Sequence, residues 1–467
     1  MQYRLISSTG APRLILIFAG WGMDATPFES LLREGYDIMV VWDYRSFYID
    51  WSVVSGYDEI CLVAWSMGVF AASQTVQAID YKITKRIAVN GTLWPVDNCR
   101  GIPEAIYYGT HDGLDERNLT KFYRRMCASR TQFVDFESVR PVRDIDGLRD
   151  ELLAVAERTI LSSQSAIRWD RAIVGHADAI FPPVNQRRAW QAADVPVEMT
   201  DDAHLIDFAA LLDREFVDKS TMTARFARGH RTYEANAPVQ AEVVERMTAM
   251  LVGHVGRDMR DCTGTILEVG SGSGSLSRRL AVLAPSARLR LWDISGDMPD
   301  GLKDDSRVKF CRCDAELAIA RVPACSLACI ASASTVQWFN SPDRFLGHCA
   351  RALAPGGILL LSTFTRGNLA EIAALTGNAL SMPTPDQWTA MATRYFDIID
   401  VAAWERDLDF ETPLDVLRHL KLTGVNSLGH SSRGETDVRD LLRRYPMRLD
   451  ARYHLTYRPM IMLLIKR

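Results

Sequence analysis

The stretch Ile266-Leu-Glu-Val-Gly-Ser-Gly-Ser-Gly274 decides the fold of one half of this chain, and Leu62-Val-Ala-Trp-Ser-Met-Gly68 decides that of the other. The later stretch reads as an apolar strand that runs into a glycine-rich turn, the context in which nucleotide-type cofactors bind. The earlier stretch places Ser66 between an apolar strand and an expected helix, the context of a hydrolase nucleophile. These signatures are unrelated, so we predict two enzymes joined in one chain.

The composition is that of a globular protein with more than one core. The chain has 467 residues, of which 48% are hydrophobic and 24% are charged, and a chain of this length usually divides into domains. Disorder and fibrous structure are excluded. The net charge of -4 argues against a general affinity for nucleic acid, so we expect no nucleic-acid partner.

The cysteines and the first residues bear on metal binding and location. The 9 cysteines are scattered with no CxxC pair, which predicts neither a metal site nor a disulfide framework. The opening Met-Gln-Tyr-Arg-Leu-Ile lacks the apolar region of a signal peptide, and no run approaches the ~18 apolar residues that span a bilayer. We therefore expect no membrane partner and a cytoplasmic location.

Apolar runs alternate with helical patterns in both halves, which predicts two α/β domains with largely parallel sheets. Strands are expected in the amino half at 13–18, 37–42, 59–65, 86–89, 105–108, 172–174 and 195–199. In the carboxyl half they are expected at 265–269, 288–292, 308–310, 327–330 and 357–364, closed by an antiparallel pair at 396–404 and 455–465. The charged helical stretch at about 110–168 predicts an inserted cap, and we expect domains at 1–219 and 220–467.

Ser66 is the expected nucleophile of the amino half, and the residues that follow it supply an acid and a base in hydrolase order. Asp178 comes directly after an expected strand, and His204 follows the last strand. In such a site the serine attacks an acyl carbon, the histidine moves its proton, and the aspartate holds the imidazole tautomer. An oxyanion hole needs two backbone N–H groups, which we expect from Met67 and Trp21.

Other residues compete for these roles, and the sequence leaves some of them open. Asp112 is the strongest rival acid because it also follows an expected strand end, whereas Asp97 and Asp202 read as turn or surface residues. His111 and His176 are rival bases, although loop histidines exposed to solvent are the simpler interpretation. The sequence does not decide between Asp178 and Asp112.

Short motifs across residues 1–215 resemble the pimeloyl-[acyl-carrier protein] methyl ester esterase family. They are Ala19-Gly-Trp-Gly22, Val63-Ala-Trp-Ser-Met-Gly68, Val89-Asn-Gly-Thr92, Gly101-Ile-Pro103 and the segments of Asp178 and His204. The resemblance implies an α/β-hydrolase fold with a helical cap. It also implies cleavage of the methyl ester of pimeloyl-[acyl-carrier protein], a step of biotin synthesis, with Ser66 and His204 in the catalytic positions.

The spacing of the glycines in the carboxyl half favours a methyl donor over a dinucleotide. Gly270, Gly272 and Gly274 alternate with serines and follow Glu268, and glycine is required where backbone must approach a ligand. Two strand-end acids complete the expected site of S-adenosylmethionine: Asp293 would accept both ribose hydroxyls, and Asp314 would accept from the adenine amino group.

The flanks of this turn resemble the malonyl-[acyl-carrier protein] O-methyltransferase family from about residue 222 to 467. The motifs are Phe226-Ala-Arg-Gly-His-Arg-Thr-Tyr233, Ala237-Pro-Val-Gln240, Ser334-Thr-Val-Gln-Trp-Phe339, Ala354-Pro-Gly-Gly-Ile358 and Thr363-Phe-Thr-Arg-Gly-Asn368. The resemblance implies a class I, Rossmann-like methyltransferase fold and methylation of the free carboxylate of a malonyl thioester. We expect Arg366 to pair with that carboxylate and Tyr233, Gln240 and Trp338 to shape the pocket.

Together the resemblances imply a bifunctional enzyme of biotin synthesis whose partner is an acyl-carrier protein bearing malonyl or pimeloyl methyl ester. Carrier proteins are acidic, and the cap contains a dense basic run in which we expect Arg124, Arg125 and Arg130 to bind the carrier. Lys121, Arg140 and Arg143 lie close by in sequence, and an ordinary solvated helix face is the alternative. A fused thioesterase or small-ester hydrolase and methyltransferase for another acid is the alternative enzyme, and a half that has lost its chemistry is the non-enzymatic one.

Overall fold

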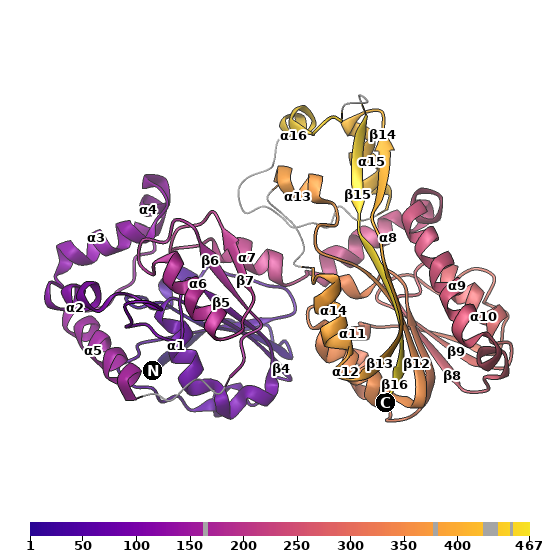
Figure 1. Cartoon of the computed structure of the whole chain (residues 1–467), viewed down its shortest axis with the longest axis horizontal. Helices are drawn as coiled ribbons and strands as arrows, with labels where there is room; N and C mark the ends of the chain where they lie inside the picture. The colour runs from indigo at the N-terminus through magenta and orange to yellow at the C-terminus, as the bar shows by residue number, and fades with distance from the viewer. Residues whose placement is uncertain (162–166, 377–381, 424–437, 449–451) are drawn as a thin grey trace. The chain divides into compact units, whose positions relative to one another are not determined.

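The apolar runs of the amino half form a central sheet in the computed structural model (Figure 1). Every residue is buried in its first three parallel strands, as expected of strands covered on both faces. The parallel strands are β2 (Arg13–Phe18), β3 (Asp37–Trp42), β4 (Glu59–Trp65), β5 (Ile83–Val89), β6 (Arg171–Gly175) and β7 (Val197–Thr200). The sheet is mixed, because β1 (Gln2–Ser7), which the sequence analysis did not anticipate, pairs antiparallel with β3.

The order of this sheet, β1-β3-β2-β4-β5-β6-β7, brings the chemical residues together. The strands from β2 to β7 are parallel, so their carboxyl ends meet at one edge. Ser66 follows β4, Asp178 follows β6 and His204 follows β7. The helices that follow strands β4, β6 and β7 are α1 (Met67–Thr75), α6 (Pro183–Ala192) and α7 (Phe208–Glu215), and the short 3-10 turns are Thr26–Phe28, Trp51–Val54 and Val76–Lys82.

A helical insertion separates β5 from β6, and it begins before the stretch at about 110–168 where the sequence predicts a cap. Its helices are α2 (Glu104–Asp112), α3 (Glu116–Met126), α4 (Arg130–Glu137) and α5 (Ile145–Leu161). The expected strand at 105–108 is therefore wrong. A short apolar run cannot be distinguished from a buried helix segment by periodicity, and Tyr107 packs on α5 with its hydroxyl donating to the Leu152 carbonyl at 2.8 Å. Asp112 consequently ends a helix, not a strand.

The carboxyl half contains a second sheet, ordered β10-β9-β8-β11-β12-β16-β13. The expected antiparallel closure forms, because β16 pairs antiparallel with both β12 and β13. The strands are β8 (Thr265–Val269), β9 (Arg288–Asp293), β10 (Val308–Arg312), β11 (Leu327–Ser332), β12 (Leu353–Phe364), β13 (Phe396–Ala403) and β16 (Pro459–Lys466). The expected strand at 455–465 is divided at Arg458, and its first part, β15 (Tyr453–Tyr457), instead pairs with β14 (Arg406–Phe410).

Helices cover both faces of the second sheet, and each face has its own apolar core (Figure 1). On one face pack α9 (Pro238–Asp261) and α10 (Ser275–Leu283). On the other pack α12 (Pro342–Ala352) and α14 (Pro385–Ala392). The remaining helices are α8 (Lys219–Asn236), α11 (Ala315–Ala318), the 3-10 turns Ile319–Arg321 and Val336–Trp338, α13 (Ala370–Thr376), α15 (Pro413–Leu422) and α16 (Val438–Arg444).

The structure describes residues 1–161, 167–376, 382–423, 438–448 and 452–467. The chain divides into two compact units, Met1–Leu211 and Leu212–Arg467. Among the helices in these described ranges, none has the length and apolar character that crossing a membrane requires.

Gly91 tests the tight packing of the first sheet. A β-carbon at this position would overlap the carbonyl oxygen of Ser66, so we expect Gly91→Ala to destabilise the amino-terminal unit by about 1–3 kcal/mol, the usual cost of overpacking. Thermal unfolding measures the effect. Gly109→Ala is the matched control, because this helical glycine has open space around it and alanine is favoured there by about 0.5–1 kcal/mol. Equal unfolding temperatures for Gly91→Ala and the parent chain would contradict the packing argument.

Candidate active sites

Ser66 occupies a strained turn between β4 and α1. Its backbone lies at φ 60° and ψ -129°, a conformation that residues other than glycine adopt only where the surrounding structure imposes it. Neighbouring glycines allow the turn, because a β-carbon at Gly68 would overlap the carbonyl oxygens of Phe18 and Ala19, and one at Gly91 would overlap that of Ser66 itself. The strain and the packing together project the serine side chain from the sheet edge.

A chain of hydrogen bonds connects the three residues expected to be catalytic. The Oγ of Ser66 lies 2.9 Å from Nε2 of His204, and Nδ1 of the same ring lies 3.0 Å from each carboxylate oxygen of Asp178. All three side chains are buried. This geometry fits a base next to a nucleophile with a third group orienting the base.

Several hydrogen bonds besides those to His204 hold the Asp178 side chain in place. One of its oxygens accepts the backbone N–H groups of Ile180 at 2.8 Å and Phe181 at 2.9 Å, and the other accepts Nε2 of Gln186 at 2.8 Å. The ring of Phe181 also stacks on His204 with 7° between the planes. The carboxylate therefore has little freedom to rotate away from the imidazole.

Asn90 and Gln186 belong to this network but were not predicted from the sequence as functional residues. Asn90, directly after β5, donates to the carbonyls of Ala203 and His204 at 2.8 and 3.0 Å and accepts the N–H of Gly175 at 2.8 Å. It thus connects the end of β6 and the loop after β7 to the end of β5. Gln186 was missed because glutamine on a helix carries no sequence signal of its own; Asn90 stood inside the quoted motif Val89-Asn-Gly-Thr92.

The structure separates the rival acids and bases from Ser66. Asp112 is 77% exposed at the end of α2, where it pairs with His111 at 2.7 Å. Asp97 is occupied by Arg100 at 2.8 Å. His176 lies exposed in the loop after β6. Asp202 contributes only its carbonyl next to Gly175 among the contacts of the described residues.

Trp21 and Met67, the residues expected to form an oxyanion hole, line the same cavity. Gly20, which precedes Trp21, lies against Ser66 so closely that an added β-carbon would be 3.1 Å from the serine Cβ. Met67 is the first residue of α1, and the first N–H groups of a helix have no partner inside it. Trp21 and Met67 line this cavity of about 20 Å³ together with Ile102, Ile106, Tyr107, Thr110, Phe122, Arg125, Leu152 and Ile180. The cavity is mostly apolar and lies between the sheet edge and the helical insertion.

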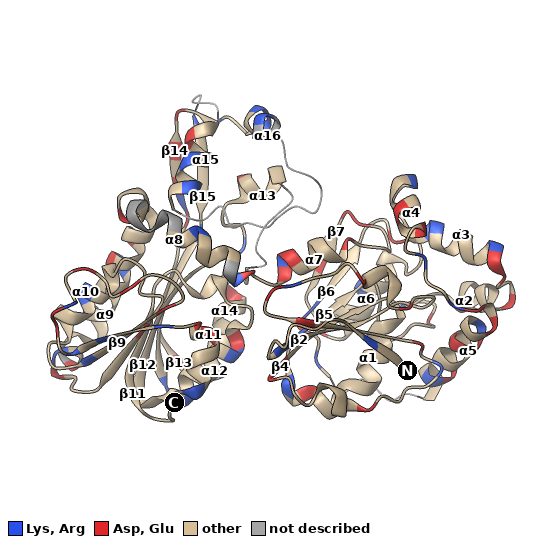
Figure 2. Cartoon of the chain, turned by 180° about the vertical axis from the view of Figure 1, so that it is seen from behind, with Lys and Arg blue, Asp and Glu red and all other residues tan. Residues whose placement is uncertain are grey.

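The arginines expected to bind a carrier lie exposed on the insertion, among acidic side chains (Figure 2). Arg124 lies over the ring of Phe133, Arg125 donates to the Ala179 carbonyl at 2.8 Å, and Arg130 begins α4. Lys121 is also exposed, whereas Arg140 is held by acidic neighbours. Arg143 is only 9% exposed, so it is not part of this basic face.

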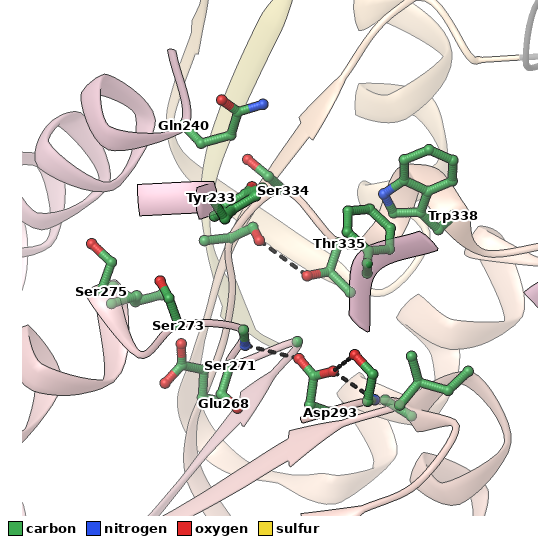
Figure 3. A pocket seen from close by; sticks show the side chains of 18 of the residues that line it. Tyr233, Gln240, Glu268, Ser271, Ser273, Ser275, Asp293, Ser334, Thr335 and Trp338 are labelled. Atoms are coloured by element: carbon green, nitrogen blue, oxygen red, sulfur yellow. Dashed lines mark hydrogen bonds between the residues drawn. The ribbon is translucent and has the colours of Figure 1, made fainter. Parts of the chain in front are cut away.

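The second site is a pocket of about 440 Å³ above the glycine-rich turn (Figure 3). Gly270, Gly272 and Gly274 all have positive φ, at 76°, 48° and 84°. A β-carbon at Gly272 would meet nothing within 4 Å, so its backbone faces open space inside the pocket. The N–H of Gly272 donates to Asp293 at 2.8 Å, which fixes the turn against the end of β9.

Glu268 is a buried acidic residue in the lining of this pocket. It is 1% exposed, and its Oε2 atom has no hydrogen-bond partner among the residues that the structure describes. Burial raises the pKa of this carboxyl to about 8, because the charged form loses its hydration. Such a group indicates that the pocket takes a ligand with a cationic or hydrogen-donating part.

Asp314 lies in the same pocket but is already engaged. The Nζ atom of Lys219 is 2.8 and 2.9 Å from its two carboxylate oxygens and 2.5 Å from Glu316. The ammonium group also lies over the ring of Phe339, 5.1 Å from its centroid. Lys219 was not identified from the sequence, because it lies 95 positions from Asp314 in a segment that resembles an ordinary helix start.

Tyr233, Gln240 and Trp338 meet at the other end of the pocket (Figure 3). They also line an adjoining cavity of about 30 Å³ with Phe226, Ser334, Gln337, Phe364, Asn368, Leu369, Met382 and Tyr457. Burial raises the pKa of Tyr233 to about 12, so this phenol keeps its proton. The structure does not bring Arg366 to this group: its side chain is exposed, and it lines neither cavity.

Comparisons with known proteins match both units. Residues 1–212 match the family model of pimeloyl-ACP methyl esterase BioG, and residues 266–357 match a methyltransferase domain. A malonyl-[acyl-carrier protein] O-methyltransferase of Bacteroides fragilis is 35% identical over 97% of this chain and 93% of its own length. One from Chlorobium phaeovibrioides is 31% identical over 54% of this chain and 97% of its own. The crystal structure of BioG from Haemophilus influenzae is 34% identical and covers 44% of this chain and 94% of its own, with a TM-score of 0.41.

The choice between the two candidate acids is testable through the reactivity of Ser66. We expect Asp178→Asn to slow the labelling of Ser66 by a fluorophosphonate about 10⁴-fold, because the imidazole loses the acceptor that holds its tautomer. Intact-protein mass spectrometry follows the labelling. Asp112→Asn removes an exposed carboxylate and should react at the parent rate. The reverse order of the two variants would assign the role to Asp112.

Proposed function

The chain belongs to the malonyl-[acyl-carrier protein] O-methyltransferase family, and from this premise we propose that its carboxyl-terminal domain, residues 220–467, methylates the free carboxylate of malonyl-[acyl-carrier protein]. The likeness to the Bacteroides fragilis protein over 97% of the chain supports this activity most directly. The amino-terminal part matches the BioG model, so the chain has a fused architecture. Its role lies in biotin synthesis.

S-adenosyl-L-methionine is the methyl donor, and the pocket above the glycine-rich turn fits it. Gly272 exposes backbone to about 440 Å³ of space, and the unpartnered oxygen of Glu268 lies within the same lining. We propose that Glu268, Gly270, Gly272, Gly274 and Asp293 hold the cofactor, and that Asp314 does so once its ion pair with Lys219 is shared or released. When bound, the cofactor supplies a methyl group that its sulfonium sulfur releases to a carboxylate oxygen.

The residues of this domain would act by binding and orientation. A malonyl carboxylate is already ionised near pH 7, so no base is required. Tyr233 keeps its phenolic proton and Gln240 has an amide at the junction of the two cavities, so both can donate to a carboxylate oxygen. We propose these neutral donors, with Trp338 excluding water, in place of Arg366 as the residues that hold the acceptor.

For residues 1–219 we propose an α/β-hydrolase domain, with the insertion as its cap, that cleaves the methyl ester of pimeloyl-[acyl-carrier protein]. The line of hydrogen bonds from Ser66 through His204 to Asp178 supports this role. Ser66 Oγ bonds to the ester carbon while His204 takes its proton, and the N–H groups of Trp21 and Met67 stabilise the oxyanion. The methoxy group leaves with that proton as methanol.

Water completes the cycle. His204 removes a proton from the water molecule as its oxygen attacks the acyl-serine, the acyl–oxygen bond to Ser66 breaks, and His204 returns the proton to the serine. The product is the free pimeloyl carboxylate on its carrier. Asp178 holds the imidazole through both halves of the reaction.

The two activities are chemically complementary. Methylation removes a charge that is costly to bury in an apolar enzyme tunnel, and hydrolysis restores it after elongation. The esterase must then spare short esters, and each methylene contributes only about 1–3 kcal/mol to such discrimination. We propose that the mostly apolar cavity between the sheet edge and the cap provides it, and that Arg124, Arg125 and Arg130 meet the acidic carrier.

Paired assays test both halves of this proposal. Malonyl-carrier protein with S-adenosyl-L-methionine should gain the mass of one methylene, and methyl pimeloyl-carrier protein should lose it, each followed by mass spectrometry. Ser66→Ala should abolish only the hydrolysis. Gly272→Asp should abolish only the methylation, because it places a carboxylate in the pocket.

A matched control separates the pocket from backbone strain. Gly356 also has positive φ and open space for a β-carbon, but it does not line the pocket, so Gly356→Asp should keep methylation. Hydrolysis that persists in Ser66→Ala would refute the esterase assignment and leave the methyltransferase standing.

The raised pKa of Glu268 predicts proton release on cofactor binding. At about pH 6.5 the carboxyl is protonated in the free protein, whereas the α-ammonium of the cofactor, with a pKa near 8, stays charged. A cation in the pocket favours the carboxylate, so binding should release up to one proton. Calorimetry in two buffers of different ionisation enthalpy counts it. The Glu268→Gln variant should bind the cofactor without releasing this proton. An equal number of protons released by the variant and the parent chain would exclude Glu268 as their source.

A further inference from the structure

The loop of residues 19–24, here called the Trp21 loop, lies next to the nucleophile but is held by residues far along the chain. Two of its contacts come from α5 and the residues just before it. The Nε1 atom of Trp21 donates to the Leu148 carbonyl at 3.0 Å, and Asp24 accepts the N–H of Val142 at 2.8 Å. A third comes from α3, where Tyr123 donates to the Gly22 carbonyl at 2.9 Å.

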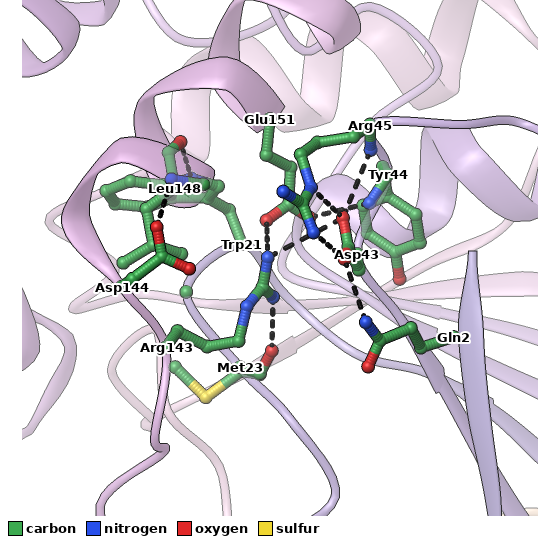
Figure 4. A network of polar contacts seen from close by, with 12 residues as sticks. Gln2, Trp21, Met23, Asp43, Tyr44, Arg45, Arg143, Asp144, Leu148 and Glu151 are labelled. Atoms are coloured by element: carbon green, nitrogen blue, oxygen red, sulfur yellow. Dashed lines mark hydrogen bonds and ion pairs between the residues drawn. The ribbon is translucent and has the colours of Figure 1, made fainter.

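A buried ion pair holds the two ends of the same loop (Figure 4). Arg143 donates to the Met23 carbonyl at 2.9 Å and to Glu151 at 2.9 Å. The second oxygen of Glu151 accepts the N–H of Tyr44 at 2.8 Å, and the hydroxyl of Tyr44 donates to the Ala19 carbonyl at 2.6 Å. Arg143 therefore contacts one end of the Trp21 loop directly, and Glu151 reaches the other end through Tyr44.

The charges of this group are balanced, and three of its four charged side chains are shielded from water. Asp43 lies 3.6 Å from Arg143 and binds Arg45 through both oxygens at 2.8 and 2.7 Å. The side chains of Arg143, Glu151 and Asp43 are 9%, 1% and 6% exposed. Apolar residues of the same volume often stabilise a fold as well as a buried ion pair does. The directional bonds to the loop are what apolar residues would not supply.

We infer that Arg143 and Glu151 are positioning residues for hydrolysis, which set the place of the Trp21 backbone N–H beside Ser66. The inference rests on the proposed esterase function. It gives the insertion a second task besides covering the site, because the same segment that forms the cap fixes the loop of the oxyanion hole. Neither side chain lines the cavity next to Ser66, so their effect would pass through the loop alone.

The test compares Arg143→Met, Arg143→Lys and Glu151→Gln in the full chain. Using para-nitrophenyl butyrate, we expect kcat to fall about 10- to 100-fold in Arg143→Met with KM unchanged, because a small displacement of an oxyanion donor slows the chemistry without weakening binding. Arg143→Lys and Glu151→Gln, which keep part of the bonding, should lose less. The rate of Ser66 labelling by a fluorophosphonate should fall in the same order.

The controls distinguish positioning from loss of fold. Arg149 lies on α5, the helix of Glu151, where it pairs with Asp146 and donates to the Leu114 carbonyl. Arg149→Met removes these contacts, neither of which reaches the Trp21 loop, and should keep the parent kcat. Methyl transfer by the same chain reports that the other unit is intact. Added guanidinium ion should restore part of the rate of Arg143→Ala, which it would not do for an unfolded domain.

The outcomes separate this inference from the proposed function. Parent rates in the Arg143 variants, or a raised KM with an unchanged kcat, would overturn it. A parent chain that labels at Ser66 but does not hydrolyse methyl pimeloyl-carrier protein would refute the substrate, while the labelling rates still decide the role of Arg143. A parent chain that does not label at Ser66 would overturn both.

Discussion

The amino-terminal site depends on backbone packing too close for a side chain at two positions. Gly68 lies against the end of β2, and Gly91 lies against the carbonyl of Ser66. The absence of a β-carbon lets the neighbouring strand ends lie close together, which allows Ser66 to adopt a φ of 60°. Side chains that follow separate strands can then come within hydrogen-bond distance of one another.

Hydrogen bonds from buried polar side chains position the loops around the amino-terminal site. The side-chain amide of Asn90 bonds to three backbone groups at the end of β6 and in the loop after β7. Arg143 bonds directly to the Trp21 loop, and Glu151 acts on it through Tyr44. A buried polar group without partners is costly, so each of these side chains permits only arrangements in which its bonds are made. The site is specified by hydrogen bonds more than by apolar contact.

The two sites differ in how many of their buried polar groups have hydrogen-bond partners within the protein. Ser66, His204 and Asp178 are each hydrogen-bonded to the next, and Gln186 donates to Asp178 but keeps one buried oxygen without a partner among the described residues. In the other pocket and its adjoining cavity, oxygens of Glu268, Gln240 and Gln337 have no hydrogen-bond partner among the described residues. Such groups suit a site whose missing partners belong to ligands.

Local sequence was enough to predict much of the fold and to select the candidate residues of both sites. The apolar runs of β2, β3, β4 and β8, the glycine turn and the serine turn are local signals. The order of serine, aspartate and histidine along the chain limited the candidate site residues to a few, among them Ser66, Asp178 and His204. The segment 105–108 was mistaken for a strand because four apolar residues fit either periodicity.

Only the tertiary structure decided which distant groups meet. Asp112 and Asp178 read alike as strand-end acids, and the sheet order places only Asp178 beside His204. The sequence also did not reveal that Lys219 pairs with Asp314, that Arg143 donates to the Met23 carbonyl, or that Arg366 is exposed. The physical reason is that periodicity and turn signals reflect the bonding of near neighbours along the chain. Contacts between residues a hundred positions apart arise from packing, which the local sequence does not encode.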